Sequence, residues 1–251
     1  MHVFRGLPSP LQRRPSAVAI GNFDGVHLGH QALLEYVKEA AQARGLIPSV
    51  VTFEPHPKDF FGRGGEVARI STLYDKVNAI LGTGIERIYI LPFNSRLACM
   101  PAETFVRDVL LKGLDACWMS VGKDFRFGGD RAGSVELLEE LSRTLPYELY
   151  VSPTFYHKEA RVSSSRIREA LAVGDLYEAA LMLGRPYSMT GRVIHGAALG
   201  RTLGFPPSRR HGRLRRPHPR TRTGRSERRR LDRHQAHGRN RRVLASRDAR
   251  L

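Results

Sequence analysis

Short apolar runs alternate with segments of helical periodicity between Ser16 and about Gly184. Apolar runs of roughly four to eight residues are typical of buried strands, whereas apolar residues spaced three or four positions apart indicate amphipathic helices. The pattern predicts strands at Ala17–Ile20, Ile47–Phe53, Arg87–Leu91, Ala116–Val121 and Glu148–Val151. It predicts helices at Gln31–Arg44, Thr72–Leu81, Ala102–Leu111, Ser134–Leu145, Ser164–Ala172 and Leu176–Leu183. Because such alternation produces a parallel sheet covered on both faces, we expect an α/β fold with a Rossmann-like, doubly wound parallel sheet.

Polar side chains that could bind a ligand or take part in catalysis follow several of the predicted strands. In a doubly wound sheet, ligands bind beyond the carboxyl ends of the strands. These ends hold His27, His30, Glu54, His56 and Asp124. The sequence therefore predicts a ligand site along this edge of the sheet.

The segment Gly21–His30 (GNFDGVHLGH) places two histidines three residues apart where the first predicted strand passes into a helix. A helix N-terminus offers unpaired N–H groups and about half a unit of positive charge, so it binds anions. Gly25 and Gly29 allow the backbone to approach a ligand closely. Two histidines and a glycine at this spacing also arise by chance, but their position between strand and helix favours a nucleotide-phosphate site.

The formal net charge of +17 suggests a nucleic-acid or anionic-surface partner until its distribution is considered. Residues 207–251 contain 17 arginines and three acidic residues, a net charge of +14, which leaves +3 for the other 206 residues. The rest of the chain thus has the charge of an ordinary soluble enzyme. Residues 207–251 contain few large apolar side chains, so we expect this segment to be disordered.

Cysteine usage and hydropathy bear on the compartment. Cys99 and Cys117 lie far apart without the spacing of a metal site, which indicates free thiols in a reducing environment. No apolar run approaches the roughly 18 residues of a membrane span, and the first residues lack the apolar core of a signal peptide. We therefore expect a cytoplasmic protein with no membrane partner.

Together with Gly21–His30, three later motifs resemble those of a known family. These motifs are FEPHP at 53–57, VGKDFRFG at 121–128 and RVSSSRIR at 161–168. In order and spacing they are similar to the nucleotidylyltransferases with a His-x-Gly-His signature, and within them to the bacterial FAD synthetases, bifunctional riboflavin kinases and FMN adenylyltransferases. The resemblance implies a nucleotidylyltransferase-type sheet, with ATP and FMN as substrates, FAD and pyrophosphate as products and Mg²⁺ as cofactor.

The resemblance also implies roles for individual residues. His27 and His30 would be catalytic, donating hydrogen bonds to the phosphates of ATP as charge develops in the transition state. Asp124 would place Mg²⁺ and phosphate. Arg161 and Arg168 would each hold two phosphate oxygens. The other residues expected to bind ATP or FMN are Asn22, Phe23, Asp24, Gly25, Gly29, Ser164, Ser165, Phe61, Phe105 and Phe127.

Some of these assignments leave alternatives. Asp24 either supports a backbone turn or belongs to the metal shell. Phe61, Phe105 and Phe127 either line a flat apolar slot for the flavin or are simply core residues. The loop at 128–134 has glycines at the separation of a phosphate-binding Walker loop but lacks its lysine, so we interpret it as a loop that closes over the flavin.

Residues 191–206 resemble the opening of the family's riboflavin kinase domain, through GRVIHG at 191–196 and GRTLGFP at 200–206. The family continues this loop with Pro-Thr-Ala-Asn and barrel strands, whereas this chain continues with Pro207-Ser208-Arg209-Arg210. A GC-rich gene read out of frame yields such a sequence; a natural basic arm is the alternative. We expect an adenylyltransferase domain at 1–184, an incomplete β-barrel kinase remnant at 185–206 without riboflavin kinase activity, and a disordered Arg-rich tail at 207–251.

Other functions stay open at this point. One is a nucleotidylyltransferase that acts on a nicotinamide or pantetheine phosphate, although the segments 53–57 and 191–206 favour the flavin enzyme. Another is a basic protein that binds nucleic acid non-specifically through its tail. A third is an inactive or unstable product, because an incomplete barrel would expose Val193, Ile194 and Leu203.

Overall fold

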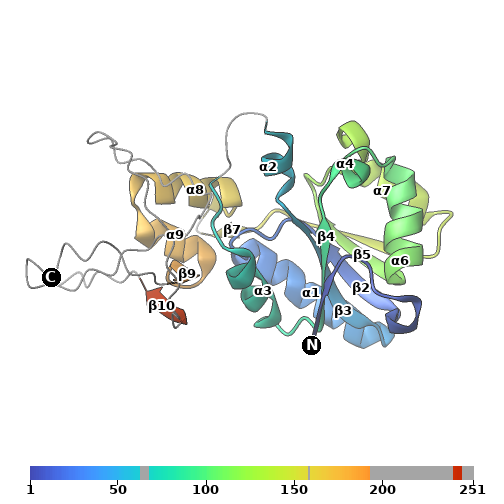
Figure 1. The fold of residues 1–251 in the computed structure, drawn as a ribbon, viewed down its shortest axis with the longest axis horizontal. Helices are drawn as coiled ribbons and strands as arrows, with labels where there is room; N and C mark the ends of the chain where they lie inside the picture. Colours follow the sequence, from blue (N-terminus) through green and yellow to red (C-terminus); the bar gives the residue numbers. More distant parts are fainter. Residues whose placement is uncertain (63–67, 158, 193–239, 245–251) are drawn as a thin grey trace, which may run out of the picture.

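The computed structural model describes residues 1–62, 68–157, 159–192 and 240–244. Within these residues, six parallel strands form one sheet (Figure 1). The strands lie in the order β1-β4-β3-β2-β5-β6. The predicted strands are all present to within one residue at each end, as β2 (Ser16–Ile20), β3 (Ile47–Glu54), β4 (Arg87–Pro92), β5 (Ala116–Gly122) and β6 (Glu148–Ser152). The prediction of a Rossmann-like parallel sheet is confirmed.

Strand β1 (His2–Arg5) has no counterpart among the predicted strands. It lies at the edge of the sheet beside β4, and its residues are mostly exposed. A short edge strand with little burial carries a weak apolar signal. Other short elements are also missing from the prediction, because they contain too few residues for a clear periodicity. These are the helices α2 (Pro57–Phe61) and α4 (Ser95–Ala98) and the small hairpin of β7 (Tyr156–His157) and β8 (Ala160–Arg161).

The predicted helices are also present, with small shifts at their ends. Helix α1 (Leu28–Arg44) begins three residues before the predicted start, because His27 caps it. The helix predicted at Ala102–Leu111 consists of α5 (Ala102–Thr104), the π-helix η2 (Phe105–Leu111) and α6 (Lys112–Leu114). The others are α3 (Leu73–Leu81), α7 (Val135–Ser142), α8 (Ser164–Val173) and α9 (Leu176–Leu183).

Helices cover both faces of the sheet, as a doubly wound fold requires. Because alternate residues of a strand point to opposite faces, each strand contributes to two clusters. On one face the strands pack against α1 and α3, in a cluster that includes Ala17, Ala19, Val50, Ile88, Leu34, Val37 and Ile80. On the other face they pack against residues 102–114 and α7, in a cluster that includes Val18, Ile20, Val51, Tyr89, Met119, Leu110 and Leu138. The two layers leave the ends of the strands accessible.

Helices α8 and α9 pack against each other in a third cluster, which Leu28 at the start of α1 also contacts. Gly184, with φ +68°, ends α9 where the sequence predicts a break. Strand β9 (Ser188–Arg192) follows and pairs antiparallel with β10 (Asn240–Leu244). Over the ranges described above, none of the helices combines the length and apolar character needed to cross a membrane.

The predicted kinase remnant (185–206) and tail (207–251) are described only in part. The sequence pattern at Tyr187–His195 also predicts one strand, and β9 confirms it over Ser188–Arg192. Strand β10 lies within the predicted tail and pairs with β9 over residues 240–244. Antiparallel pairing there gives backbone N–H and C=O groups hydrogen-bond partners that an isolated strand would lack. The rest of both segments, including the motif at 200–206, lies outside the described residues.

Candidate active site

A cavity of about 960 Å³ lies at the carboxyl edge of the sheet. Its lining includes residues at or near the ends of β2, β3, β5 and β6, among them Gly21, Phe53, Gly122 and Ser152. The volume is within the range of pockets that hold small-molecule ligands. The edge at which the sequence predicts a ligand site therefore carries a cavity large enough for one.

The loop between β2 and α1 forms part of the cavity wall. Phe23 (φ +49°) and Val26 (φ +43°) adopt the left-handed backbone region, and Gly25 has φ +85°. For a residue other than glycine such a conformation costs about 1–3 kcal/mol and persists only where the surroundings enforce it. A Cβ atom at Gly25 would lie 2.8 Å from Ile70 Cγ2, so glycine is also required for space. The surrounding structure thus holds this loop in a strained shape.

His27 and His30 stand together at the start of α1. Their rings stack with centroids 3.6 Å apart, and His27 Nδ1 accepts a hydrogen bond from the His30 backbone N–H at 3.3 Å. Burial lowers the pKa of His27 to about 4 and the pKa of His30 well below its usual value. Both rings are therefore neutral at pH 7. Because Nδ1 of His27 is an acceptor, its proton lies on Nε2, which is free to donate to a ligand.

Asp24 and Arg168 form a buried ion pair with 2.7 Å between Oδ2 and a guanidinium nitrogen. Asp24 also accepts hydrogen bonds from the backbone N–H groups of Ile70 and Ser71 at 3.0 Å. Arg168 Nε donates to the carbonyl of Ala68 at 2.7 Å. Burial raises the pKa of Asp24, but the hydrogen bond from Ile70 and the charge of Arg168 outweigh it and hold that pKa below its usual value. Neither residue lines the cavity, and these contacts favour support of the backbone as the role of Asp24.

Asp124 and Arg161 form a second ion pair, which lines the cavity. Their side chains are 74% and 52% exposed, so solvent reaches both charges. An exposed pair of this kind has a small net stability, and a ligand can replace either partner at little cost. The structure thus brings Asp124 and Arg161 together at the cavity and separates Arg168 from them.

The N-terminus of α8 joins the two histidines at the cavity. Ser163 caps this helix by accepting a hydrogen bond from the Arg166 backbone N–H at 3.3 Å. Ser164 Oγ donates to the Asp24 carbonyl at 3.1 Å, which ties the start of α8 to the β2–α1 loop. Of the other predicted binding residues, the cavity lining contains Asn22, Phe23, Gly29 and Ser164, and it does not contain Gly25 or Ser165.

Aromatic side chains line the cavity in two groups. In the first, Phe127 stacks on Phe125 with centroids 5.4 Å apart and lies 5.8 Å from Phe105. Phe105 and Phe127 are also buried in the core, so the two roles considered for them are compatible. In the second group, Phe61 contacts Phe60 and Phe93 edge to face. The sequence does not indicate Phe60 and Phe93, because an isolated aromatic residue gives no signal that distinguishes a cavity wall from the core.

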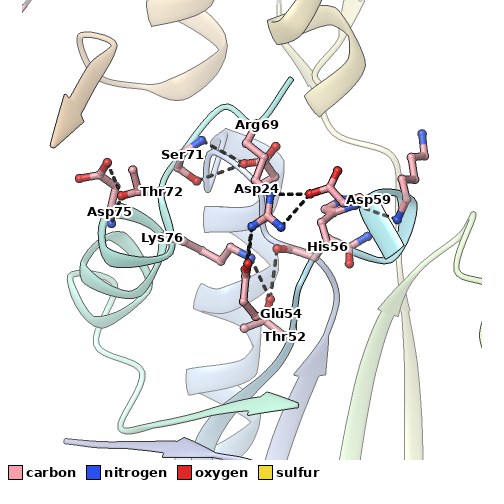
Figure 2. A network of polar contacts seen from close by, with 12 residues as sticks. Asp24, Thr52, Glu54, His56, Asp59, Arg69, Ser71, Thr72, Asp75 and Lys76 are labelled. Carbon is pink, nitrogen blue, oxygen red and sulfur yellow. Dashed lines mark hydrogen bonds and ion pairs between the residues drawn. The ribbon is translucent and has the colours of Figure 1, made fainter. Parts of the chain in front are cut away.

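A polar network that the sequence analysis did not predict lies near the end of β3 (Figure 2). Arg69 bridges Glu54 at 2.7 Å and Asp59 at 2.8 Å. His56 lines the cavity and caps α2, and burial lowers its pKa to about 4. Lys76 is buried and donates to Thr52 Oγ1 at 3.4 Å, and burial lowers its pKa as well. The motif at 53–57 identifies His56 as a candidate, whereas Arg69 and Lys76 stand alone in the sequence.

The side chains suited to metals are dispersed. In the described part of the chain, no three His, Cys, Asp or Glu side chains converge into a metal site. Cys99 and Cys117 are both free thiols, as predicted. Asp124 is the carboxylate that both lines the cavity and was predicted to hold Mg²⁺.

The fold and the cavity define a class. A Rossmann-like parallel sheet with a helix N-terminus at its carboxyl edge is the arrangement by which many α/β proteins hold nucleotide phosphates. The chain belongs to the FAD synthetase family, whose family model matches residues 9–166. A second family model, riboflavin kinase, matches residues 183–209.

Several known proteins are similar to this chain. The bifunctional riboflavin kinase/FMN adenylyltransferase of Escherichia coli (strain K12) is 37% identical over 209 residues, which cover 82% of this chain and 66% of that protein. The protein of the same name from Pseudomonas fluorescens is 40% identical over 207 residues, with the same coverage. A crystal structure titled macrolide-efflux protein from Streptococcus pneumoniae superimposes with a TM-score of 0.67 at 29% identity, covering 82% of this chain and 66% of that one. The chain thus spans slightly less than two thirds of these relatives.

Proposed function

We propose that this chain transfers AMP from ATP to FMN and releases FAD and pyrophosphate. The observation that carries the proposal is the pair of stacked, neutral histidines at the start of α1, on a cavity that also has aromatic walls. Membership of the FAD synthetase family and the names of the relatives support the choice of FMN as acceptor.

The triphosphate of ATP fits the side of the cavity formed by the starts of α1 and α8. Backbone N–H groups there attract phosphate oxygens. The neutral ring of His27 donates through Nε2, and Nδ1 of His30 is buried without a hydrogen-bond partner in the described structure. Arg161 adds a positive charge beside them. These groups would stabilise the negative charge that gathers when an FMN phosphate oxygen attacks the α-phosphorus.

FMN fits between these groups and the aromatic walls. A flavin ring is flat and apolar, so it gains from contact with stacked or edge-on aromatic side chains. Phe61, with 48% of its surface exposed, offers such a face, and Phe127 offers another on the opposite group. With the phosphate of FMN directed towards the histidines, the protein would act by holding both substrates in line.

The donor set at Asp124 fits Mg²⁺. This ion uses few protein carboxylates and completes its coordination with phosphate oxygens and water, so one exposed carboxylate on a nucleotide cavity suffices. Asp124 would hold it together with the phosphates of ATP. When bound, Mg²⁺ supplies positive charge that neutralises the leaving pyrophosphate.

The test is to incubate the purified chain with ATP, FMN and Mg²⁺ and to follow FAD by chromatography. His27→Ala and His30→Ala should each abolish most FAD formation. His2→Ala is the matched control, because His2 lies in the edge strand β1 away from the cavity, and it should leave the rate unchanged. Nicotinamide mononucleotide and phosphopantetheine, offered as acceptors, should yield no adenylylated product. A folded wild-type chain that makes no FAD would contradict the proposal.

Riboflavin kinase activity is a separate question in the same assay. Riboflavin replaces FMN, and the formation of FMN is followed. We expect none, because the match to the riboflavin kinase family model covers residues 183–209 and then ends. Conversion of riboflavin to FMN by the purified chain would overturn this expectation.

A further inference from the structure

The strained loop before α1 is held by side chains from distant parts of the chain. Five of its backbone groups each have such a partner: Thr52 Oγ1 donates to the Asn22 carbonyl (3.2 Å), Ser71 Oγ accepts from the Gly25 N–H (3.1 Å), Ser164 Oγ donates to the Asp24 carbonyl (3.1 Å), and Arg185 donates to the carbonyls of Gly25 (2.6 Å) and Val26 (3.0 Å). Besides the glycine at position 25, the loop therefore depends on long-range contacts for its shape.

Arg185 makes the largest contribution among these partners. Its guanidinium donates to the carbonyls of Gly25 at 2.6 Å, Val26 at 3.0 Å and Leu183 at 3.1 Å. Gln31 completes the arrangement, because its amide donates to the carbonyls of Val26 and Leu183 at 2.9 Å. The Arg185 side chain thus links two successive carbonyls of the loop, those of Gly25 and Val26, to the end of α9 by hydrogen bonds.

The charge of Arg185 is directed at backbone oxygens. These three hydrogen bonds all end on backbone carbonyls, and burial lowers the pKa of Arg185 by more than the charge of Asp75 raises it. Hydrogen bonds from a charged donor are stronger than those between neutral groups. The backbone packs closely here as well, since a Cβ atom at Gly184 would lie 2.6 Å from Leu28 Cδ2. Residues 183–185 are therefore in direct contact with the start of α1.

We propose that Arg185 is a positioning residue for adenylyl transfer, which fixes the peptide groups immediately before His27 and so sets the place of the His27 ring. Val26 contributes the carbonyl carbon of the peptide bond to His27, so a shift of this carbonyl moves the histidine directly. The inference rests on the proposed function for its catalytic consequence. It assigns a role to a residue outside the segment matched by the FAD synthetase family model, 9–166.

The test compares full-length variants. Arg185→Met removes the donors and keeps the apolar stem, and Arg185→Lys keeps a charge without the planar fork. Arg87→Met is the matched control, because Arg87 also donates to a backbone carbonyl, that of Gln12 at 2.8 Å, at the other end of the sheet. A misplacement of about 1 Å costs on the order of 100-fold in rate, so we expect kcat of R185M to fall at least about 30-fold with KM for FMN little changed. R185K should recover part of the loss, and R87M should match the wild type.

A second measurement separates the two proposals. Hydrogen exchange of the peptide covering residues 22–31, followed by mass spectrometry, reports on the loop without requiring activity. Faster exchange there in R185M, with unchanged exchange in R87M, supports the positioning role even if the wild type makes no FAD, in which case only the proposed function fails. With an active wild type, a kcat of R185M close to that of R87M overturns the inference; unchanged exchange in this peptide overturns it whether or not the wild type is active. If R185M does not fold, R185K decides by the same two measurements.

Discussion

Two carboxylate–guanidinium ion pairs lie near the start of α8, and they differ in their exposure to solvent and in the groups that surround them. The carboxylate and guanidinium of Asp24 and Arg168 are 3% and 18% exposed, whereas those of Asp124 and Arg161 are 74% and 52% exposed. The buried pair is surrounded by backbone partners, and the exposed pair faces the cavity. Of the three arginines in the motif at 161–168, Arg168 thus belongs to the buried framework, Arg166 pairs with Glu178, and Arg161 lines the cavity.

The largest expected effect is on stability, from removal of one partner of the buried pair. Arg168→Met leaves the carboxylate of Asp24 buried without its counter-charge, which costs about 3–5 kcal/mol in the free energy of unfolding. Arg161→Met, the matched control, should cost less than about 1 kcal/mol, because solvent replaces its contact. Urea unfolding of both variants measures the difference. Equal losses would show that the two pairs do not differ in this way.

A pH series should show an effect of up to about 3 kcal/mol from the buried histidine His27. Its pKa is about 4 in the folded protein against 6.5 for the free side chain, so the unfolded chain binds more protons between these values. Stability from this group is therefore complete above pH 6.5, falls as pH drops towards 4 and then levels off, with about 1.4 kcal/mol lost per pH unit at most.

The carboxylate of Asp24 should affect the free energy of unfolding in a different pH range from His27. Its folded pKa lies below 3.8, so its contribution persists down to about that pH and is lost below it. Unfolding free energies of the wild type and His27→Gln between pH 7 and pH 3.5 separate the two groups. The variant should lose the share of the slope between pH 6.5 and 4 that His27 contributes, while the buried His30 and His56 keep theirs, and an unchanged slope would contradict the low pKa of His27.

For ATP affinity, we expect the replacement of Arg161 to have a larger effect than the replacement of Arg168, the reverse of the order expected for stability. Arg161→Met removes a charged partner at the cavity, and hydrogen bonds to charged groups contribute about 1.5–3 kcal/mol, so ATP affinity should fall roughly 10- to 100-fold. Titration calorimetry with ATP measures this loss. Arg44→Met is a suitable control, because Arg44 pairs with Glu148 on the surface away from the cavity. If R161M bound ATP as tightly as the wild type, the exposed pair would have no part in the nucleotide site.

The smallest expected effect is that of Asp124→Asn on folding. Because this carboxylate is mostly exposed, its replacement should change the free energy of unfolding by less than about 0.5 kcal/mol. Thermal or urea unfolding in the absence of nucleotide and Mg²⁺ provides the measurement. A loss of several kcal/mol would place Asp124 in the framework with Asp24.

The parts of the fold that follow local rules could be predicted from the sequence. The buried strand β2 is visible as a continuous apolar run at Ala17–Ile20, and the cap of α8 is visible as a run of serines that opens a helical pattern. The different environments of Arg161 and Arg168 could not be predicted, because Arg161 lies in the short strand β8 and Arg168 in α8, and the sequence does not show which of the two faces the cavity after folding. The contact of Arg185 with Gly25 could not be predicted either, since 160 residues separate the two.

The aromatic walls illustrate the same limit. Phe127 lies in a motif and is a candidate, whereas Phe60 in helix α2 and Phe93 after β4 meet only in the folded protein, with centroids 5.4 Å apart. A single phenylalanine has the same apolar signature in a core and in a cavity wall. Only the three-dimensional arrangement distinguishes these two environments.

The contact between Arg185 and the loop before α1 also has a consequence for biosynthesis. The ribosome makes the histidine motif early in synthesis. At about 5–20 residues per second, Arg185, which holds the loop before that motif, is added on the order of 10 s later. During that interval the nascent chain can form β2 and α1 while Gly25 and Val26 still lack their last hydrogen-bond donor. The newly made sheet would therefore be present before the site is complete, and α9 must dock before the loop is fully fixed.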